Sequence, residues 1–134
     1  MPVKIKVLDQ GAGFLFYCTG RVTAVELIEA IKALVDKADA ISFCDYVIIE
    51  YAEDAILAAS PENLRMIADT VKLAGEINPD AAIAVIAASD SVYGLSRMWS
   101  VFVEDSSLRT RVFRHKSDAE KWLNEVIGWG DDQP

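Results

Sequence analysis

The sequence predicts a single α/β domain: an N-terminal β-hairpin followed by four strand–helix units, forming a largely parallel sheet packed by helices. Two observations predict this fold. Segments of strand length, either apolar or alternating with a period of two, are separated by segments in which apolar residues recur at helical spacing. In addition, 134 residues, 52% of them hydrophobic and 25% charged, suffice for one compact core without disulfides or metal. We expect the domain to occupy residues 1–128 and residues 129–134 to form a loose tail.

The first two strands are predicted from alternation and from a glycine-containing turn. Residues 3–8 alternate valine or isoleucine with lysine, which is typical of a half-exposed edge strand. Gly11-Ala12-Gly13 allows a tight reversal, and the aromatic-rich residues 14–18 then form an antiparallel partner. The glycines superficially resemble a nucleotide-binding loop, but a strand follows them and no Gly-Lys-Ser/Thr is present, so we interpret them as a turn.

The first helix is predicted from a capping box and the next strand from its composition. Thr23 and Glu26 have the spacing at which each side chain caps the other's backbone N–H. Apolar residues at helical spacing follow, so we expect a helix over residues 24–38. Residues 46–51 are mostly β-branched or aromatic and apolar on both faces, which indicates a central strand.

The middle of the chain repeats this pattern. Ser60-Pro61 provides an N-cap and a first-turn proline for a second long helix, which we expect Gly75 and Pro79 to end. The small apolar residues 81–88 are the next strand. A third helix, capped within Ser89-Asp90-Ser91, is expected to run to about Val103.

The last unit is a short strand over residues 109–114 and a final helix. The spacing of Ser117 and Glu120 predicts a second capping box at its start. The buried face of this helix is expected to be Trp122, Leu123, Val126 and Ile127. Because right-handed crossovers make successive strands parallel, the element order β-β-α-β-α-β-α-β-α gives a compact sheet with helices against it.

Composition and charge exclude several classes of function. The net charge of −8 argues against nucleic-acid binding, which needs an excess of basic residues. The N-terminus lacks the apolar core of a signal peptide, and no segment approaches the ~20 apolar residues that span a bilayer. Cys18 and Cys44 occur singly, which favours buried free thiols in a reducing compartment. We therefore expect a soluble cytoplasmic protein without an integral membrane segment.

Catalytic and metal chemistry find little support in the sequence. Glu50 and Asp54 could act as acid and base, and His115 is the sole histidine, but no spacing brings a nucleophile near it. We interpret these residues as solvated side chains. One histidine and unclustered cysteines predict neither a metal site nor a cofactor.

The carboxyl ends of the parallel strands are the expected place for a binding site, because helix N-termini point there as well. That rim collects residues 19–23, 50–54, 89–94 and 115–117. The third helix, moreover, carries more apolar residues than one buried stripe needs. It is therefore either fully buried or it supplies a dimer face or the wall of an apolar pocket. The predicted binding residues are Glu50, Tyr51, Asp54, Ser91, Tyr93, Arg97 and Met98.

Charges are segregated along the chain. Six acidic and no basic residues lie between Lys37 and Arg65, whereas Arg109, Arg111, Arg114 and Lys116 cluster late. The alternatives are a solvated surface with chance clustering and opposite patches that steer a protein partner or a second copy of the chain.

Several motifs resemble the SpoIIAA-like proteins of the STAS superfamily, the sulfate-transporter and anti-sigma-factor-antagonist domains. They are a Tyr-Gly-Leu-x-Arg-Met segment at 93–98 and an Ala-x-x-Trp-Leu segment at 119–123, within the matching stretches 20–23, 84–98 and 112–114. The resemblance implies a four-turn β/α superhelix and regulation by protein binding. The antagonists carry a phosphorylated serine after the third strand. Residues 50–55 hold no serine, and Ser60 lies further on, so that switch is not implied here.

Three functions follow as hypotheses. The first is a non-catalytic STAS-like regulatory or protein-interaction module, a homodimer, which an exposed apolar face on the third helix would favour. The second is a carrier of a small apolar or lipid ligand, because the fold resembles Sec14-type domains; a dry cavity beneath the third helix would favour it. The third is an enzyme, which would require Glu50 and His115 to share one cleft.

Overall fold

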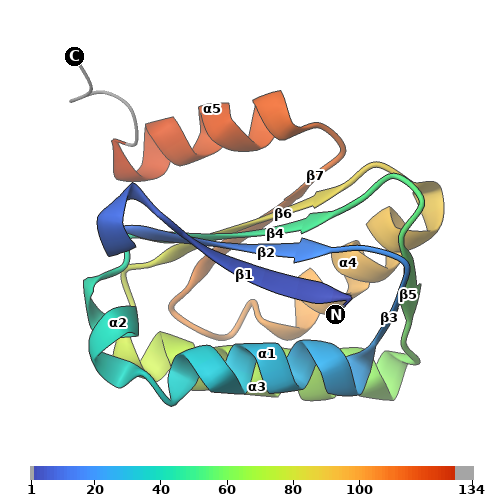
Figure 1. Cartoon of the computed structure of the whole chain (residues 1–134), viewed down its shortest axis with the longest axis horizontal. Coiled ribbons are helices and arrows are strands. Elements are labelled where there is room, and N and C mark those ends of the chain that lie inside the picture. The colour runs from blue at the N-terminus through green and yellow to red at the C-terminus, as the bar shows by residue number, and fades with distance from the viewer. Residues whose placement is uncertain (1, 129–134) are drawn as a thin grey trace.

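The computed structural model describes residues 2–128, so the predicted tail lies outside the described residues. A five-stranded sheet runs in the order β1-β2-β4-β6-β7, with β1 antiparallel to β2 and all other neighbours parallel (Figure 1). The hairpin and the largely parallel sheet are therefore confirmed. The strands of this sheet are β1 (Val3–Leu8), β2 (Gly13–Cys18), β4 (Tyr46–Tyr51), β6 (Ala82–Ala87) and β7 (Arg109–Phe113).

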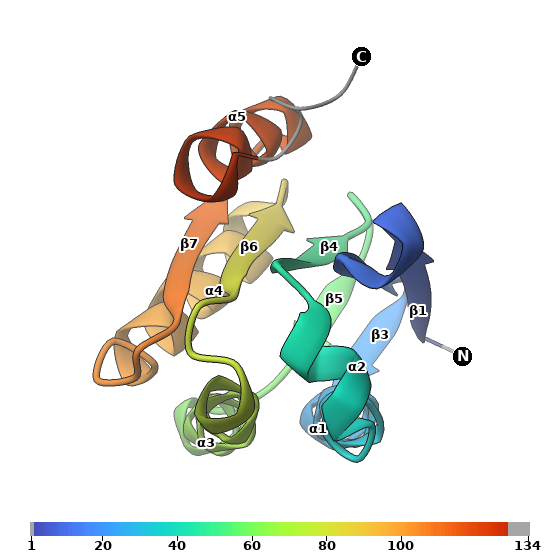
Figure 2. The same ribbon diagram turned by 90° about the vertical axis from the view of Figure 1, so that its left-hand side faces the viewer.

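Helices cover both faces of the sheet unequally. One face is covered by α1 (Ala24–Val35), α3 (Pro61–Ile77) and α4 (Asp90–Phe102), and the other by α5 (Lys116–Ile127), as Figures 1 and 2 show. The larger core lies beneath the three helices and the smaller beneath α5. All six residues of β6 are buried because this central strand is covered on both sides.

A second, two-stranded parallel sheet was not predicted. It pairs β3 (Arg21–Thr23) with β5 (Ile56–Ala58) and continues the pairing of β2 with β4 beyond their ends. Val22 and Leu57 are its buried residues. Strands of three residues are too short to show a period, and the pairing partner is distant in sequence, so no local signal predicts them.

The helix expected over residues 24–38 ends three residues early, and a short helix that was not predicted follows it. The first, α1, ends at Val35, and a short α2 (Ala38–Phe43) follows. The buried amide of Asn78 donates to the carbonyls of Ile41 and Cys44, at 2.8 and 2.6 Å. The break between α1 and α2 turns the chain toward β4. The amide of Asn78, which is distant in sequence, supplies the hydrogen bonds that two carbonyls at the end of α2 would otherwise lack.

Two predicted helix signals were wrong, and the hairpin turn uses different residues. Gly75 lies inside α3, where a Cβ would sit 2.9 Å from Cγ of Leu108, so this glycine permits close packing. The Ser117 capping box does not form because α5 already begins at Lys116. The reversal after β1 is a single turn, η1 (Asp9–Gly11), with positive φ at Asp9 and Gln10 as well as Gly11.

Candidate functional site

The carboxyl ends of the parallel strands and the N-termini of α1, α3, α4 and α5 lie at one end of the molecule, on the right in Figure 1. This is the predicted rim. Ser89 caps α4 there, accepting from the Val92 N–H at 3.2 Å. The first turn of α4 is thereby held directly beyond β6 and beside the end of β7.

A cluster of charged and aromatic side chains occupies this part of the rim. The guanidinium carbon of Arg114, just after β7, lies 4.9 Å from the centre of the Tyr93 ring. That of Arg97, one turn further along α4, lies 5.8 Å from the same centre, and its Nη1 donates to the Tyr93 hydroxyl at 3.2 Å. We call Asp90, Tyr93, Arg97 and Arg114 the Tyr93 cluster.

Arg114 is held in place by two further bonds. Its Nη2 donates to the Asp90 carboxylate and to the Ala88 carbonyl, both at 2.7 Å. These bonds join β7 to the start of α4 and fix the guanidinium against the Tyr93 ring. Since the cluster holds two arginines and one carboxylate, it is locally positive on a chain whose net charge is −8.

Exposed apolar side chains lie next to this cluster on α4. Met98 is 39% exposed and Val101 is 59% exposed, whereas Val92 and Trp99 are buried. The helix is thus neither fully buried nor polar on its outer face. We call Tyr93, Arg97, Met98, Val101 and Arg114 the α4 surface.

The other predicted binding residues are scattered. Ser91 is exposed in the first turn of α4, and Asp54 is exposed in the loop between β4 and β5. Glu50 is half-buried and faces the α5 side of the sheet, as Ile48 does. Tyr51 is buried and does not reach the surface. Asp90, Val101 and Arg114 were not predicted as site residues. The positions of Asp90 and Arg114 next to strand ends, and of Val101 on the apolar third helix, were signals that could have identified them.

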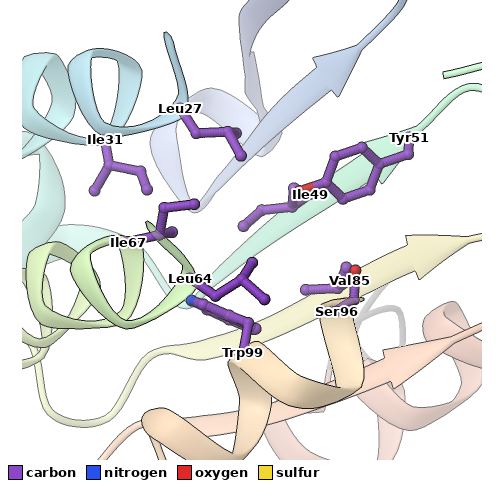
Figure 3. A pocket seen from close by; sticks show the side chains of 9 residues that line it. All are labelled: Leu27, Ile31, Ile49, Tyr51, Leu64, Ile67, Val85, Ser96 and Trp99. Atoms are coloured by element: carbon purple, nitrogen blue, oxygen red, sulfur yellow. The ribbon is translucent and has the colours of Figure 1, made fainter. Parts of the chain in front are cut away.

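The cavities beneath the helices are small (Figure 3). One, of about 20 Å³, lies between α1, α3, α4 and the sheet and is lined by Tyr51, Ser96 and Trp99 among others. A second, of about 40 Å³, is lined by Phe16, Leu34 and other apolar side chains. Ligand pockets usually measure about 300–1,000 Å³, and one water needs only about 10–15 Å³. These cavities therefore have room for water, but not for a lipid.

The buried Cys18, Cys44 and Tyr51 side chains are held in their neutral forms. Burial raises the pKa of the Cys18 thiol to about 12, and burial also raises the pKa of the Cys44 thiol. Burial, and secondarily the neighbouring Cys18, raises the pKa of Tyr51. Since a thiolate is the reactive form of cysteine, neither thiol is prepared for nucleophilic chemistry.

Glu50 and His115 come from strands that are not neighbours in the sheet. Glu50 lies in β4, and His115 follows β7, with β6 between the two strands. Among residues 2–128, no hydrogen bond or ion pair joins them, and no group of three or more His, Cys, Asp or Glu could hold a metal ion. No helix in this range is long and apolar enough to cross a membrane.

The fold is of the SpoIIAA-like α/β type, as the sequence motifs predicted. A crystal structure of an uncharacterised DUF3478-family protein from Shewanella loihica PV-4, described as having a SpoIIAA-like fold, matches 90% of this chain and 91% of its own. The TM-score is 0.50 and the sequence identity is 18%, so the likeness concerns the fold. Comparisons with protein-family models and with curated proteins gave no match.

Proposed function

We propose that this chain is a non-catalytic regulatory module that binds an acidic surface of a partner protein through the α4 surface. The observation that carries this proposal is the contact of two arginines with the half-buried Tyr93, beside the exposed Met98 and Val101. Tyrosine, arginine and methionine are enriched in protein interfaces, where an aromatic anchor and its cation supply much of the affinity.

The charge of the α4 surface favours a different protein over a second copy in a symmetric dimer. A two-fold interface places the same patch of both copies together, so two patches that each carry Arg97 and Arg114 would face one another. An acidic partner would instead be attracted by both arginines. The homodimer expected from the sequence, with the third helix as its face, stays a prediction.

The cavities give the carrier hypothesis no support. A lipid-sized ligand would need a volume many times that of the two cavities beneath the helices. The SpoIIAA-like fold is in keeping with regulation by protein contacts, but function is a property of the site rather than of the fold. The proposal accordingly rests on the α4 surface.

A crosslinking experiment tests the proposal. A photo-crosslinking amino acid is placed at Val101 and, as the matched control, at Val25, which is 63% exposed on α1. In the native host we expect a discrete adduct from position 101 that is absent at position 25 and is lost with Arg97→Glu. Equal adducts at both positions, or an adduct insensitive to Arg97→Glu, would contradict the proposal. So would an adduct of twice the chain's 14.7 kDa.

A further inference from the structure

The edge strand β1 has a free side that is independent of the α4 surface. β1 is the outer strand of the five-stranded sheet and pairs only with β2 within the described residues (Figure 2). Two of its apolar residues, Ile5 and Val7, are 39% and 64% exposed. An open edge strand offers backbone N–H and C=O groups to another extended segment.

The pairing with β2 determines which backbone groups are free. The Thr19 N–H donates to the Pro2 carbonyl at 2.8 Å, which makes residues 2 and 19 a hydrogen-bonded pair. In an antiparallel ladder such pairs alternate with non-bonded ones, so Lys4 and Lys6 also bond inward to β2. The N–H and C=O groups of Val3, Ile5 and Val7 therefore point outward to the open edge.

The two sides of the strand differ in chemistry. Lys4 and Lys6 are exposed on the α5 side of the sheet. On the other side, a hollow of about 290 Å³ lies between β1 and α1, lined mainly by Val3, Ile5, Ala30 and Ala33, with Glu26 and Glu29 beside them. The Glu26 carboxylate is already engaged by the backbone N–H and hydroxyl of Thr23. The hollow thus offers apolar contact to side chains of an added strand.

Self-pairing of this edge is unfavourable in the antiparallel registers that use most of the strand. The residues with outward backbone groups are odd-numbered, so they must pair with odd-numbered residues of a second β1. In every register that pairs at least two of Val3, Ile5 and Val7 with one another, a lysine then lies opposite a lysine. Like charges directly opposite one another destabilise a sheet. Carboxylates opposite Lys4 and Lys6 would instead be attracted.

We propose that β1 accepts an extended segment of another protein in which acidic side chains alternate with apolar ones. The acidic residues would lie opposite Lys4 and Lys6. The apolar residues would lie opposite Val3, Ile5 and Val7, toward the hollow beside α1. The backbone groups of the odd-numbered residues would complete the ladder.

The test uses two synthetic peptides and the whole chain. The probe is Val-Glu-Val-Glu-Val flanked by threonines, and the control peptide has lysine in place of glutamate. Binding is measured by titration of the ¹⁵N-labelled protein, followed by amide hydrogen exchange. We expect the glutamate peptide to bind about tenfold more tightly than the lysine peptide. A change of this order is expected because the lysine peptide replaces two opposite-charge pairs by two like-charge pairs. Exchange should slow at Ile5 and Val7, whereas Lys4 and Lys6 are already protected.

Three variants separate the contributions. The double substitution Lys4→Glu and Lys6→Glu should reverse the preference between the peptides. Ile5→Pro removes an outward N–H, which an edge strand tolerates, and should abolish binding of both. Ile5→Ala keeps that N–H and should retain the charge preference.

Several results would overturn the proposal. Equal affinity for the two peptides would do so, as would binding to a folded Ile5→Pro variant at unchanged strength. Protection of Ile5 and Val7 that increases with protein concentration in the absence of peptide would assign the edge to a second copy. None of these readouts involves the α4 surface, so they are independent of the crosslinking experiment.

Discussion

A Cβ at Gly13 would lie 2.2 Å from Cζ of Tyr46, because the Tyr46 ring lies directly against the backbone of this glycine. The two residues are register partners in the neighbouring strands β2 and β4. Tyr46 is 1% exposed, and its hydroxyl donates to the Asp9 carboxylate. The Tyr46 ring is therefore fixed by this hydrogen bond and by its contact with the backbone of Gly13. A larger side chain at position 13 would collide with the ring.

Gly13→Ala is expected to destabilise the protein by about 1–3 kcal/mol, the usual effect of overpacking a core. Urea denaturation measures the change. Gly94→Ala is the matched control, since a Cβ there meets no atom within 4 Å and alanine favours the helix. It should leave stability unchanged or raise it. Equal effects of the two substitutions would contradict the packing argument.

Asn78→Ala is expected to destabilise the protein by about 1–3 kcal/mol, because the buried carbonyls of Ile41 and Cys44 lose their donor. Asn78→Asp should cost more at neutral pH, since a carboxylate would face those carbonyls. Burial raises the pKa of such a carboxyl, so the deficit should grow as the pH rises above about 3.9, the ordinary value for aspartate. Denaturation curves at several pH values test this, and a flat deficit would refute it.

Both native thiols should resist modification. Cys18 is fully buried and Cys44 is 4% exposed, and burial raises the pKa of each. A thiol-specific reagent in mildly alkaline buffer should label neither in the folded protein and both in denaturant. Ser91→Cys places a thiol at an exposed position and should react at once. Rapid labelling of the wild-type chain would show that the core opens readily.

The capping box of α1 should make stability depend on pH. The backbone N–H of Thr23, and next its hydroxyl, donate to Glu26 and lower the pKa of that carboxyl below 4.5. A lowered folded-state pKa contributes stability that is present above 4.5 and lost as the pH falls through the folded value. The stability gap between wild type and Glu26→Gln should therefore close in acid. Glu29→Gln, on the same helix, measures the effect of removing charge alone.

The sequence predicted the elements that are long or strongly patterned. Alternation at residues 3–8, apolar residues on both faces of β4 and β6, and the caps at Thr23, Ser60 and Ser89 are local signals. The structure contains each of these strands and caps, although burial does not alternate along the edge strand β1. The missed features depend on distant partners. The pairing of β3 with β5 and the bonds from Asn78 to α2 join segments that are more than 30 residues apart.

The site was predicted in part. Topology placed Ser91 and Tyr93 at the rim, because strand ends and helix N-termini necessarily meet there. Arg97 was predicted from its spacing of four residues from Tyr93 on the third helix. Topology does not predict which face of the sheet a side chain at a strand end points to. Tyr51 and Glu50 are adjacent in β4, yet one is buried beneath the three helices and the other faces the α5 side.

The strands of the large sheet lie side by side in the order in which a ribosome makes them. Each strand that emerges during translation therefore finds its neighbour already present, and the sheet can grow from one edge as synthesis proceeds. The last unit brings β7 and then α5, which alone among the described helices covers Ile48 and Ala84. Until α5 has left the ribosome, this apolar face of the sheet stays exposed. We therefore expect it to be the face on which chaperones can bind the nascent chain for longest.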